Sequence, residues 1–249
     1  MYLSEPKLSD IVKKQLRFKL NAYAAYFSTL VFMQIGALIL AITGSMYSAA
    51  YDSFSSVKIV DLSNNTNVVL AMAWALFLGI ILTTVARRNE AFSFVTTRLS
   101  NQLANFLFML TASLFAGIIA ALTGPVLKLF GFLRYEEMAV YTPGIIAAPG
   151  DFVLRIITAI AYVLLFFLIG YAISSLVQLH KVFIGIFIIL FIAFSSATES
   201  WNGAQYIGNI FEFFSYEQSL PFFLLKICGT VLGLFTISAI ITNRLEVRN

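Results

Sequence analysis

Long apolar runs separated by short polar links constrain this 249-residue chain more than any other feature. The runs cover residues 22–44, 66–86, 102–123, 154–178, 182–197 and 221–242. All but the short fifth run reach the roughly 20 apolar residues that a helix needs to cross a bilayer. Because 60% of the residues are apolar and 11% are charged, a water-soluble fold would lack polar cover for its surface. The sequence therefore predicts an all-α integral membrane protein, a single domain with six transmembrane helices.

Basic residues favour one orientation of the six spans. With both termini inside, eleven of the 16 lysines and arginines lie on the inner side: Lys7, Lys13, Lys14, Arg17, Lys19, Arg87, Arg88, Arg98, Lys181, Arg244 and Arg248. Basic residues near span ends mark the cytoplasmic side of a membrane protein. We therefore expect a multi-pass protein of the cell membrane with both termini in the cytoplasm. The net charge of +4 follows from this placement and does not indicate a nucleic-acid partner.

Residues 1–21 predict an amphipathic elbow helix that lies in the inner membrane interface. Its apolar positions recur at helical spacing, at Leu8, Ile11, Val12, Leu16 and Leu20. Lys13, Lys14 and Arg17 point away from this stripe, toward anionic lipid. Such a helix either anchors the chain or also packs against a cytoplasmic partner, and the sequence leaves both open.

The link between the second and third spans, residues 87–101, is longer than a tight turn requires. It predicts a cytoplasmic helix whose exposed apolar side chains stand among charges, as in the core and rim of an interface. The candidate contact residues are Arg87, Arg88, Asn89, Glu90, Phe92, Phe94, Val95 and Arg98. The alternative is an interfacial segment whose aromatic rings rest in lipid.

Residues 198–220 are too polar to face lipid and too apolar for open water, which predicts an outer re-entrant segment between spans five and six. Lys226, early in the sixth span, either extends toward the outer headgroups or pairs with Glu199 or Glu212 as an outer gate. Gln34 in the first span either bonds a neighbouring helix or faces a cavity.

Six glycines lie within the predicted spans, where small residues let helices approach closely. They are Gly79, Gly117, Gly170, Gly185, Gly229 and Gly233. The pair Gly229-x-x-x-Gly233 suits packing within the chain or a seam between two subunits. For this pair we expect packing within the chain.

The sequence lacks the residues of a self-contained enzyme. It has no Gly-x-x-x-x-Gly-Lys-Ser/Thr phosphate loop, so any ATP and Mg²⁺ would be bound by a separate subunit. One histidine and one cysteine are too few for a zinc site of the usual kind, and we expect no metal or directly bound cofactor.

Taken together, the elbow helix, six spans with both ends inside, the arginine-flanked link and the excursion before the last span resemble the ABC-2 (type V) exporter permeases. The chain looks most like the small permeases of Gram-positive bacteria, among them subunits of phenol-soluble-modulin and bacteriocin-immunity exporters. In that family the link after span two is a coupling helix that docks on a cytoplasmic ATPase subunit. The resemblance thus implies an ATPase partner, a second permease (a copy or a sibling) and export of an amphipathic cargo such as a toxin or antimicrobial peptide. The alternative function is a non-transporting scaffold or regulator of a protease or sensor kinase.

If the link docks on an ATPase, the double substitution Phe92→Ala and Phe94→Ala should lower ATP-dependent export strongly, since both apolar anchors are removed. Membrane insertion should be unchanged, because neither residue lies in a span. Export assays on membranes with matched amounts of protein measure the effect. Unchanged export would favour the lipid-resting segment.

Overall fold

The computed structural model describes residues 7–43, 47–49, 58–60, 64–84, 97–134, 148–195, 213–214 and 219–245. Helices make up most of them: α1 (Leu8–Ala22), α2 (Ala24–Thr43), α3 (Asn65–Leu82), α5 (Arg98–Arg134), α6 (Pro149–Leu179), α7 (Val182–Ser195) and α9 (Leu220–Leu245). Two short strands, β1 (Tyr47–Ala49) and β2 (Lys58–Val60), form an antiparallel ladder with Tyr47 opposite Val60. The helical prediction is confirmed, and this ladder in the first link is an addition to it.

Among the described residues, five helices are long and apolar enough to cross a membrane, namely α2, α3, α5, α6 and α9. They make the chain a multi-pass helical membrane protein. The predicted span at 182–197 is the helix α7, whose 14 residues rise only about 21 Å, less than the roughly 30 Å hydrocarbon core. A crossing by this segment therefore stays a prediction.

Neighbouring side chains fix the direction of each long helix. Two contacts at different heights join each packed pair: Tyr26–Trp74 and Gln34–Asn67 (α2, α3), Leu76–Gly170 and Thr83–Gln178 (α3, α6), Phe108–Phe167 and Gly117–Ile160 (α5, α6), and Gln102–Ala239 and Phe106–Phe235 (α5, α9). The numbering within these pairs makes α2 and α5 run one way and α3, α6 and α9 the other. Since α6 and α9 are parallel, the chain between them must return along the bundle, which supports a fifth pass.

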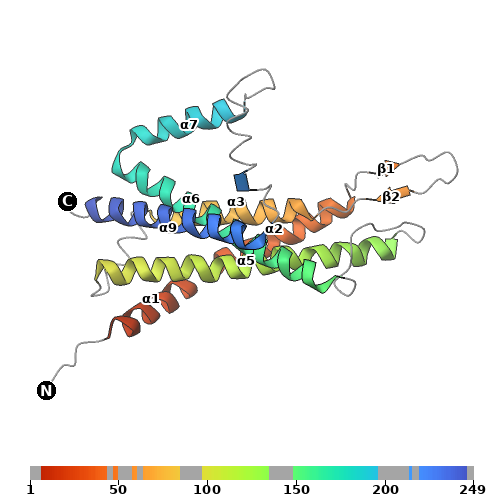
Figure 1. Ribbon diagram of the computed structural model, residues 1–249, viewed down its shortest axis with the longest axis horizontal. Helices are drawn as coiled ribbons and strands as arrows, with labels where there is room; N and C mark the ends of the chain where they lie inside the picture. Colours follow the sequence, from red (N-terminus) through yellow and green to blue (C-terminus); the bar gives the residue numbers. More distant parts are fainter. Residues whose placement is uncertain are drawn as a thin grey trace.

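The two ends of the bundle are therefore distinct (Figure 1). One end, here the α1 end, holds α1, the end of α3, the start of α5, the α6–α7 turn and the end of α9. The other end, here the hairpin end, holds β1, β2 and the start of α6. The first and last described helices thus meet the same end of the bundle.

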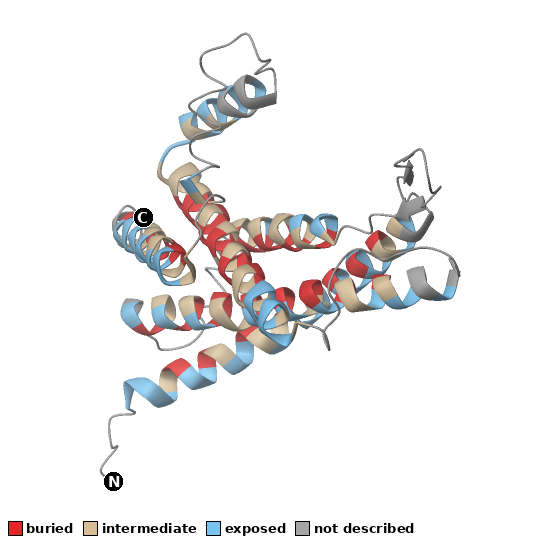
Figure 2. Cartoon of the chain, turned by 45° about the vertical axis from the view of Figure 1, so that its right-hand side comes forward, coloured by how far each residue is buried: buried red, intermediate tan, exposed pale blue. Residues whose placement is uncertain are grey.

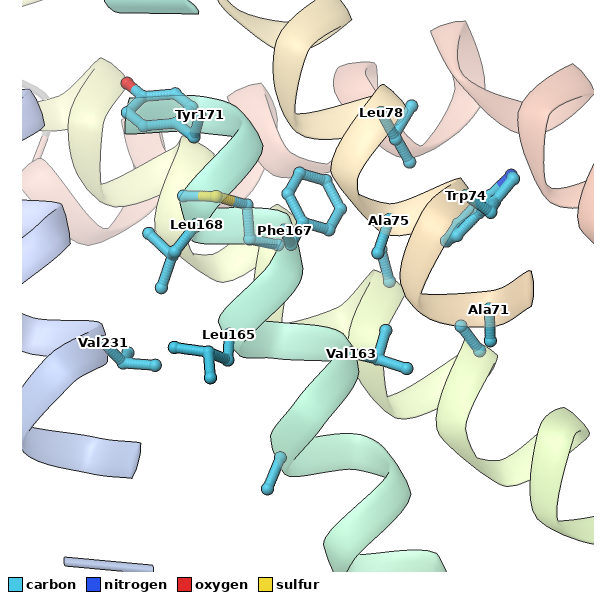
Figure 3. Packing of buried hydrophobic residues seen from close by; sticks show 14 of the residues in the cluster. Ala71, Trp74, Ala75, Leu78, Val163, Leu165, Phe167, Leu168, Tyr171 and Val231 are labelled. Carbon is cyan, nitrogen blue, oxygen red and sulfur yellow. The ribbon is translucent and has the colours of Figure 1, made fainter. Parts of the chain in front are cut away.

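Helix α6 is the centre of the packing, because it contacts α3, α5 and α9. Figure 2 shows its buried side as a nearly continuous stripe. Figure 3 shows Phe167 and Val163 of α6 directed toward Ala75 and Leu78 of α3, with Val231 of α9 on the opposite side. The outward faces carry exposed apolar side chains, such as Phe32 and Phe222, which suits a lipid surrounding.

Glycine sets the closest helix approaches within the bundle. A methyl group at Gly79 would overlap the carbonyl oxygen of Phe167, and one at Gly170 would overlap that of Leu76. At Gly117 it would lie 2.6 Å from a side-chain carbon of Ile160. The expected role is confirmed for these three glycines.

The glycines at 185, 229 and 233 make no such approach to the described residues, and a seam between two subunits stays a prediction. None of them has a described atom within 4 Å of the position that a Cβ would take. Those of α9 lie on an exposed face beside Cys228, which is also exposed. Glycine spacing alone does not tell which face of a helix is turned to its neighbours.

Helix α5 also differs from its predicted span, 102–123. It continues through Pro125 to Arg134, although proline normally interrupts a helix because it lacks the N–H donor. Just before the proline, the side-chain amide of Asn64 donates to the carbonyl of Ala120 at 2.8 Å. Such side-chain donors satisfy backbone acceptors near a helix irregularity.

The glycine contacts make a matched test. Gly170→Ala should lower the free energy of unfolding by about 1–3 kcal/mol, because the added methyl group forces α3 and α6 apart. Gly229→Ala should change it by less than about 1 kcal/mol, since the added methyl meets open space. Reversible unfolding of the purified protein in mixed micelles measures both. Equal losses for the two variants would contradict this assignment of the α3–α6 contact.

Candidate functional site

The predicted docking residues fall mostly outside the described residues. Arg87, Arg88, Asn89, Glu90, Phe92, Phe94 and Val95 all lie in the part of the link that the structure does not describe, and Arg98 is the first residue of α5. The described flanks, Thr84 after α3 and Thr97 before α5, both belong to the α1 end of the bundle. The docking role of the link therefore stays a prediction.

The predicted outer gate is described only at Lys226. Its Nζ donates to the carbonyl of Phe213 at 3.2 Å and lies 4.2 Å from the centre of that ring. Glu199 and Glu212 lie outside the described residues. The neighbouring Phe214 accepts from the hydroxyl of Tyr162 in α6 at 3.0 Å. Both alternatives for Lys226, the headgroup contact and the gate, stay predictions.

Helix α1 turns most of its apolar stripe to the bundle, and its predicted outward residues Lys13, Lys14 and Arg17 are exposed. Its buried residues are Val12, Gln15 and Lys19, one turn apart along one side. Leu8, at the head of the predicted stripe, is exposed. Leu16, in contrast, packs partly against the core cluster. Two polar residues, Gln15 and Lys19, thus lie beside this stripe on the inward face of α1.

Lys19 is the centre of a polar cluster between α1, α5 and α6. Its Nζ donates to Oδ1 of Asn101 at 3.0 Å and to Oδ1 of Asn105. The amide of Asn105 in turn donates to the hydroxyl oxygen of Tyr171, at 3.3 Å. We call Gln15, Lys19, Asn101, Asn105 and Tyr171 the α1–α5 cluster. Through it, the elbow helix is bonded to the first turns of α5, directly after the link.

The α1–α5 cluster leaves a charge uncompensated. The described residues contain two carboxylates, Asp10 and Asp151, and neither pairs with Lys19. Burial lowers the pKa of Lys19 from 10.5 to about 8, because the charged form loses its hydration. The side-chain amide of Gln15, one turn earlier, is buried with both its nitrogen and its oxygen unpartnered among the described residues. Each such group costs about 1–3 kcal/mol when no partner is supplied.

A second polar cluster lies toward the hairpin end, between α2, α3 and α5. Gln34 donates to the carbonyl of Asn67 at 2.8 Å. Of the two alternatives for Gln34, a bond to a neighbouring helix or a place facing a cavity, the structure shows the bond. Asn64 accepts from the side chains of Asn67 and Thr123, at 2.8 and 2.7 Å. These hydrogen bonds hold the apolar spans together. The side-chain oxygen atoms of Gln34 and Asn67 have no donor among the described residues.

The described residues hold no group of three or more His, Cys, Asp or Glu side chains placed to bind a metal. The chain matches no protein-family model, no curated protein and no solved structure. The class that the fold itself defines is a helical multi-pass membrane protein, with a buried lysine between its elbow helix and its bundle.

Sequence reasoning did not find the α1–α5 cluster. It counted Lys19 among the inner basic residues and Asn101 as the end of the link. One signal was present: Gln15 and Lys19, and likewise Asn101 and Asn105, are four residues apart and share a helix face. Two polar pairs of this kind, one on the elbow helix and one at the head of a span, indicate a hydrogen-bonded joint between helices.

The pKa of Lys19 predicts how tightly α1 docks at different pH. Below pH 8 the docked lysine is charged and bears the full penalty of burial. Between about pH 8 and 10.5 it is neutral when docked but charged when α1 is free, so docking should tighten by up to about 3 kcal/mol. Spin labels at Lys14→Cys on α1 and Leu107→Cys on α5, in a Cys228→Ser background without anionic lipid, report the distance. Lys19→Met should abolish the pH dependence, and a variant that keeps it would contradict the assignment.

Lys226→Met should be nearly neutral, because a partly exposed contact of an ammonium with a ring contributes about 0.5–1 kcal/mol. Thermal unfolding measures the contribution of Lys226 to stability, and transport activity of the same preparation measures its contribution to a gate. A large loss of transport with unchanged stability would instead support the gate.

Proposed function

We propose that the chain is the membrane subunit of an ATP-driven exporter of the ABC-2 type. In this proposal a cytoplasmic ATPase subunit docks on the link between α3 and α5, and a second permease, a copy or a sibling, completes the pathway. The chain itself hydrolyses nothing, and ATP and Mg²⁺ are bound by the partner. The α1 end is then the cytoplasmic side of the cell membrane.

The observation that carries the proposal is the position of α1 relative to the link. The link leaves α3 and enters α5 at the end of the bundle where α1 is bonded to α5. A subunit pressing on the link would therefore act on α5 and α1 together.

The packing of α5 suggests how a movement of the link would be transmitted to the other helices. Its buried side contacts α6 through Phe108 and Gly117, and its first turns contact α9 through Gln102. The α5–α6 contact includes a close backbone approach, so a displacement of α5 would move α6 as a unit rather than by bending side chains. Closure of the ATPase subunits would thus be converted into a change at the hairpin end.

An amphipathic cargo suits the composition of the helices better than a sugar or an ion. The faces of α2, α7 and α9 that are exposed in the single chain are almost wholly apolar among the described residues, and the second permease would enclose part of them as the wall of the pathway. Such walls offer few groups to replace a hydration shell, which an ion or sugar would have to shed. A peptide with one apolar face could keep that face against them.

Isolation of the assembly tests the proposal. The tagged chain, solubilised in a mild detergent, should retain an ATPase subunit with a phosphate-binding loop, identified by mass spectrometry of the co-purified proteins. A photo-crosslinking residue at position 92 should attach to that subunit, whereas the same residue at position 222, on the exposed face of α9, should not.

Recovery of a protease or sensor kinase in place of an ATPase would support the scaffold alternative and overturn the transport proposal. Retention of the ATPase without any crosslink from position 92 would keep an exporter but remove the link as its docking surface.

A further inference from the structure

The α1–α5 cluster offers binding groups that the described residues leave unused. Lys19 has three N–H donors, and the described residues supply acceptors for two of them, Asn101 and Asn105. Gln15 offers two more donors and one acceptor oxygen, all buried and unpartnered. Buried polar groups are hydrogen-bonded in nearly all proteins, so unused donors and an unused acceptor together indicate a missing partner.

The charge of Lys19 decides the character of that partner. Both of its acceptors are neutral amides, which bond the ammonium without compensating its charge. An anionic oxygen would both accept a hydrogen bond from the ammonium and compensate its charge. Hydrogen bonds between oppositely charged groups are stronger than those between neutral groups. Gln15 adds two requirements: a further acceptor for its nitrogen and a donor for its oxygen. A phosphate ester that carries a hydroxyl group meets all three conditions.

The surroundings favour a lipid as the source of this phosphate. The bond from Lys19 to Asn105 is buried, whereas the bond to Asn101 is only partly buried, so the cluster reaches the surface beside Asn101. The outward side of α1 exposes Lys13, Lys14 and Arg17, which attract an anionic membrane surface. Lys19 also lies just before Tyr23, where α1 ends and the first spanning helix begins.

We infer that Lys19 and Gln15 form a seat for the headgroup of an anionic phospholipid with free hydroxyls, such as phosphatidylglycerol, between α1 and the first turns of α5. The lipid phosphate accepts from Lys19 and from the nitrogen of Gln15, and a headgroup hydroxyl donates to the oxygen of Gln15. This seat is independent of the proposed transport function.

Native mass spectrometry of the full chain in detergent, with lipids added at pH 7, tests the seat. The chain should bind phosphatidylglycerol and should prefer it to phosphatidylcholine, which has no net charge and no hydroxyl. Lys19→Met should weaken this binding about tenfold, the effect expected for loss of a charge-assisted bond. Lys14→Met removes an exposed lysine from the same helix and should change the binding less than about twofold.

A second variant separates the seat from general charge attraction and from misfolding. Gln15→Leu keeps the charge of Lys19 but removes the groups that recognise the hydroxyl. It should lose the preference for phosphatidylglycerol over phosphatidylmethanol, an anionic lipid without a headgroup hydroxyl. Lys19→Arg, which keeps the charge, should retain most of the binding that Lys19→Met loses.

Inorganic phosphate and glycerol phosphate, added without lipid, distinguish the sources of the anion. Protection of the chain against thermal unfolding by either of them, lost in Lys19→Met, would support a phosphate seat filled from solution. Equal losses in the Lys19 and Lys14 variants would show plain surface attraction and overturn the seat. Equal binding of charged and uncharged lipids would also overturn the seat. The counter-charge of Lys19 would then have to come from a carboxylate of a partner protein.

Discussion

The close crossing of α3 and α6 is the contact on which the rest of the bundle depends. Helices in lipid gain little from burying apolar surface against each other, so they associate through close backbone approach and a few hydrogen bonds. Gly79 and Gly170 bring the two backbones together at this crossing. With α6 fixed against α3, its other sides are free to receive α5 and α9. The parallel direction of α6 and α9 then requires the intervening chain to return along the bundle.

A polar joint adds the elbow helix to this bundle. The bonds of Lys19 to Asn101 and Asn105 attach α1 to α5, and the bond of Asn105 to Tyr171 extends the joint to α6. The joint lies beside Thr97, where the described chain resumes after the link between α3 and α5. The same joint contains a buried charge with neutral partners, so it is held less tightly than the glycine-backed core.

The sequence was sufficient to predict the class of protein and most helix positions. The reason is that lipid requires each spanning segment to be an apolar helix of about 20 residues, whichever helices lie beside it. It could not show which face of a helix is turned inward. Gly170 and Gly229 look alike in the sequence, but only the first is covered by another backbone. Likewise Lys13, Lys14 and Arg17 are exposed as the pattern of α1 predicts, but nothing in that pattern shows that Lys19 is buried. Pairing between α1 and α5 joins residues more than 80 positions apart, which no local pattern reveals.

The central claim is that both α1 and the α6–α7 turn lie on the cytoplasmic side, with the start of α6 on the other. Single cysteines at Lys7, Lys181 and Asp151, in a Cys228→Ser background, can be labelled in whole cells with a maleimide that does not cross membranes. The account predicts that the cysteine at Asp151 reacts in intact cells, and that those at Lys7 and Lys181 react only after the membrane is opened. Labelling of Lys7→Cys and Lys181→Cys from opposite sides would contradict it.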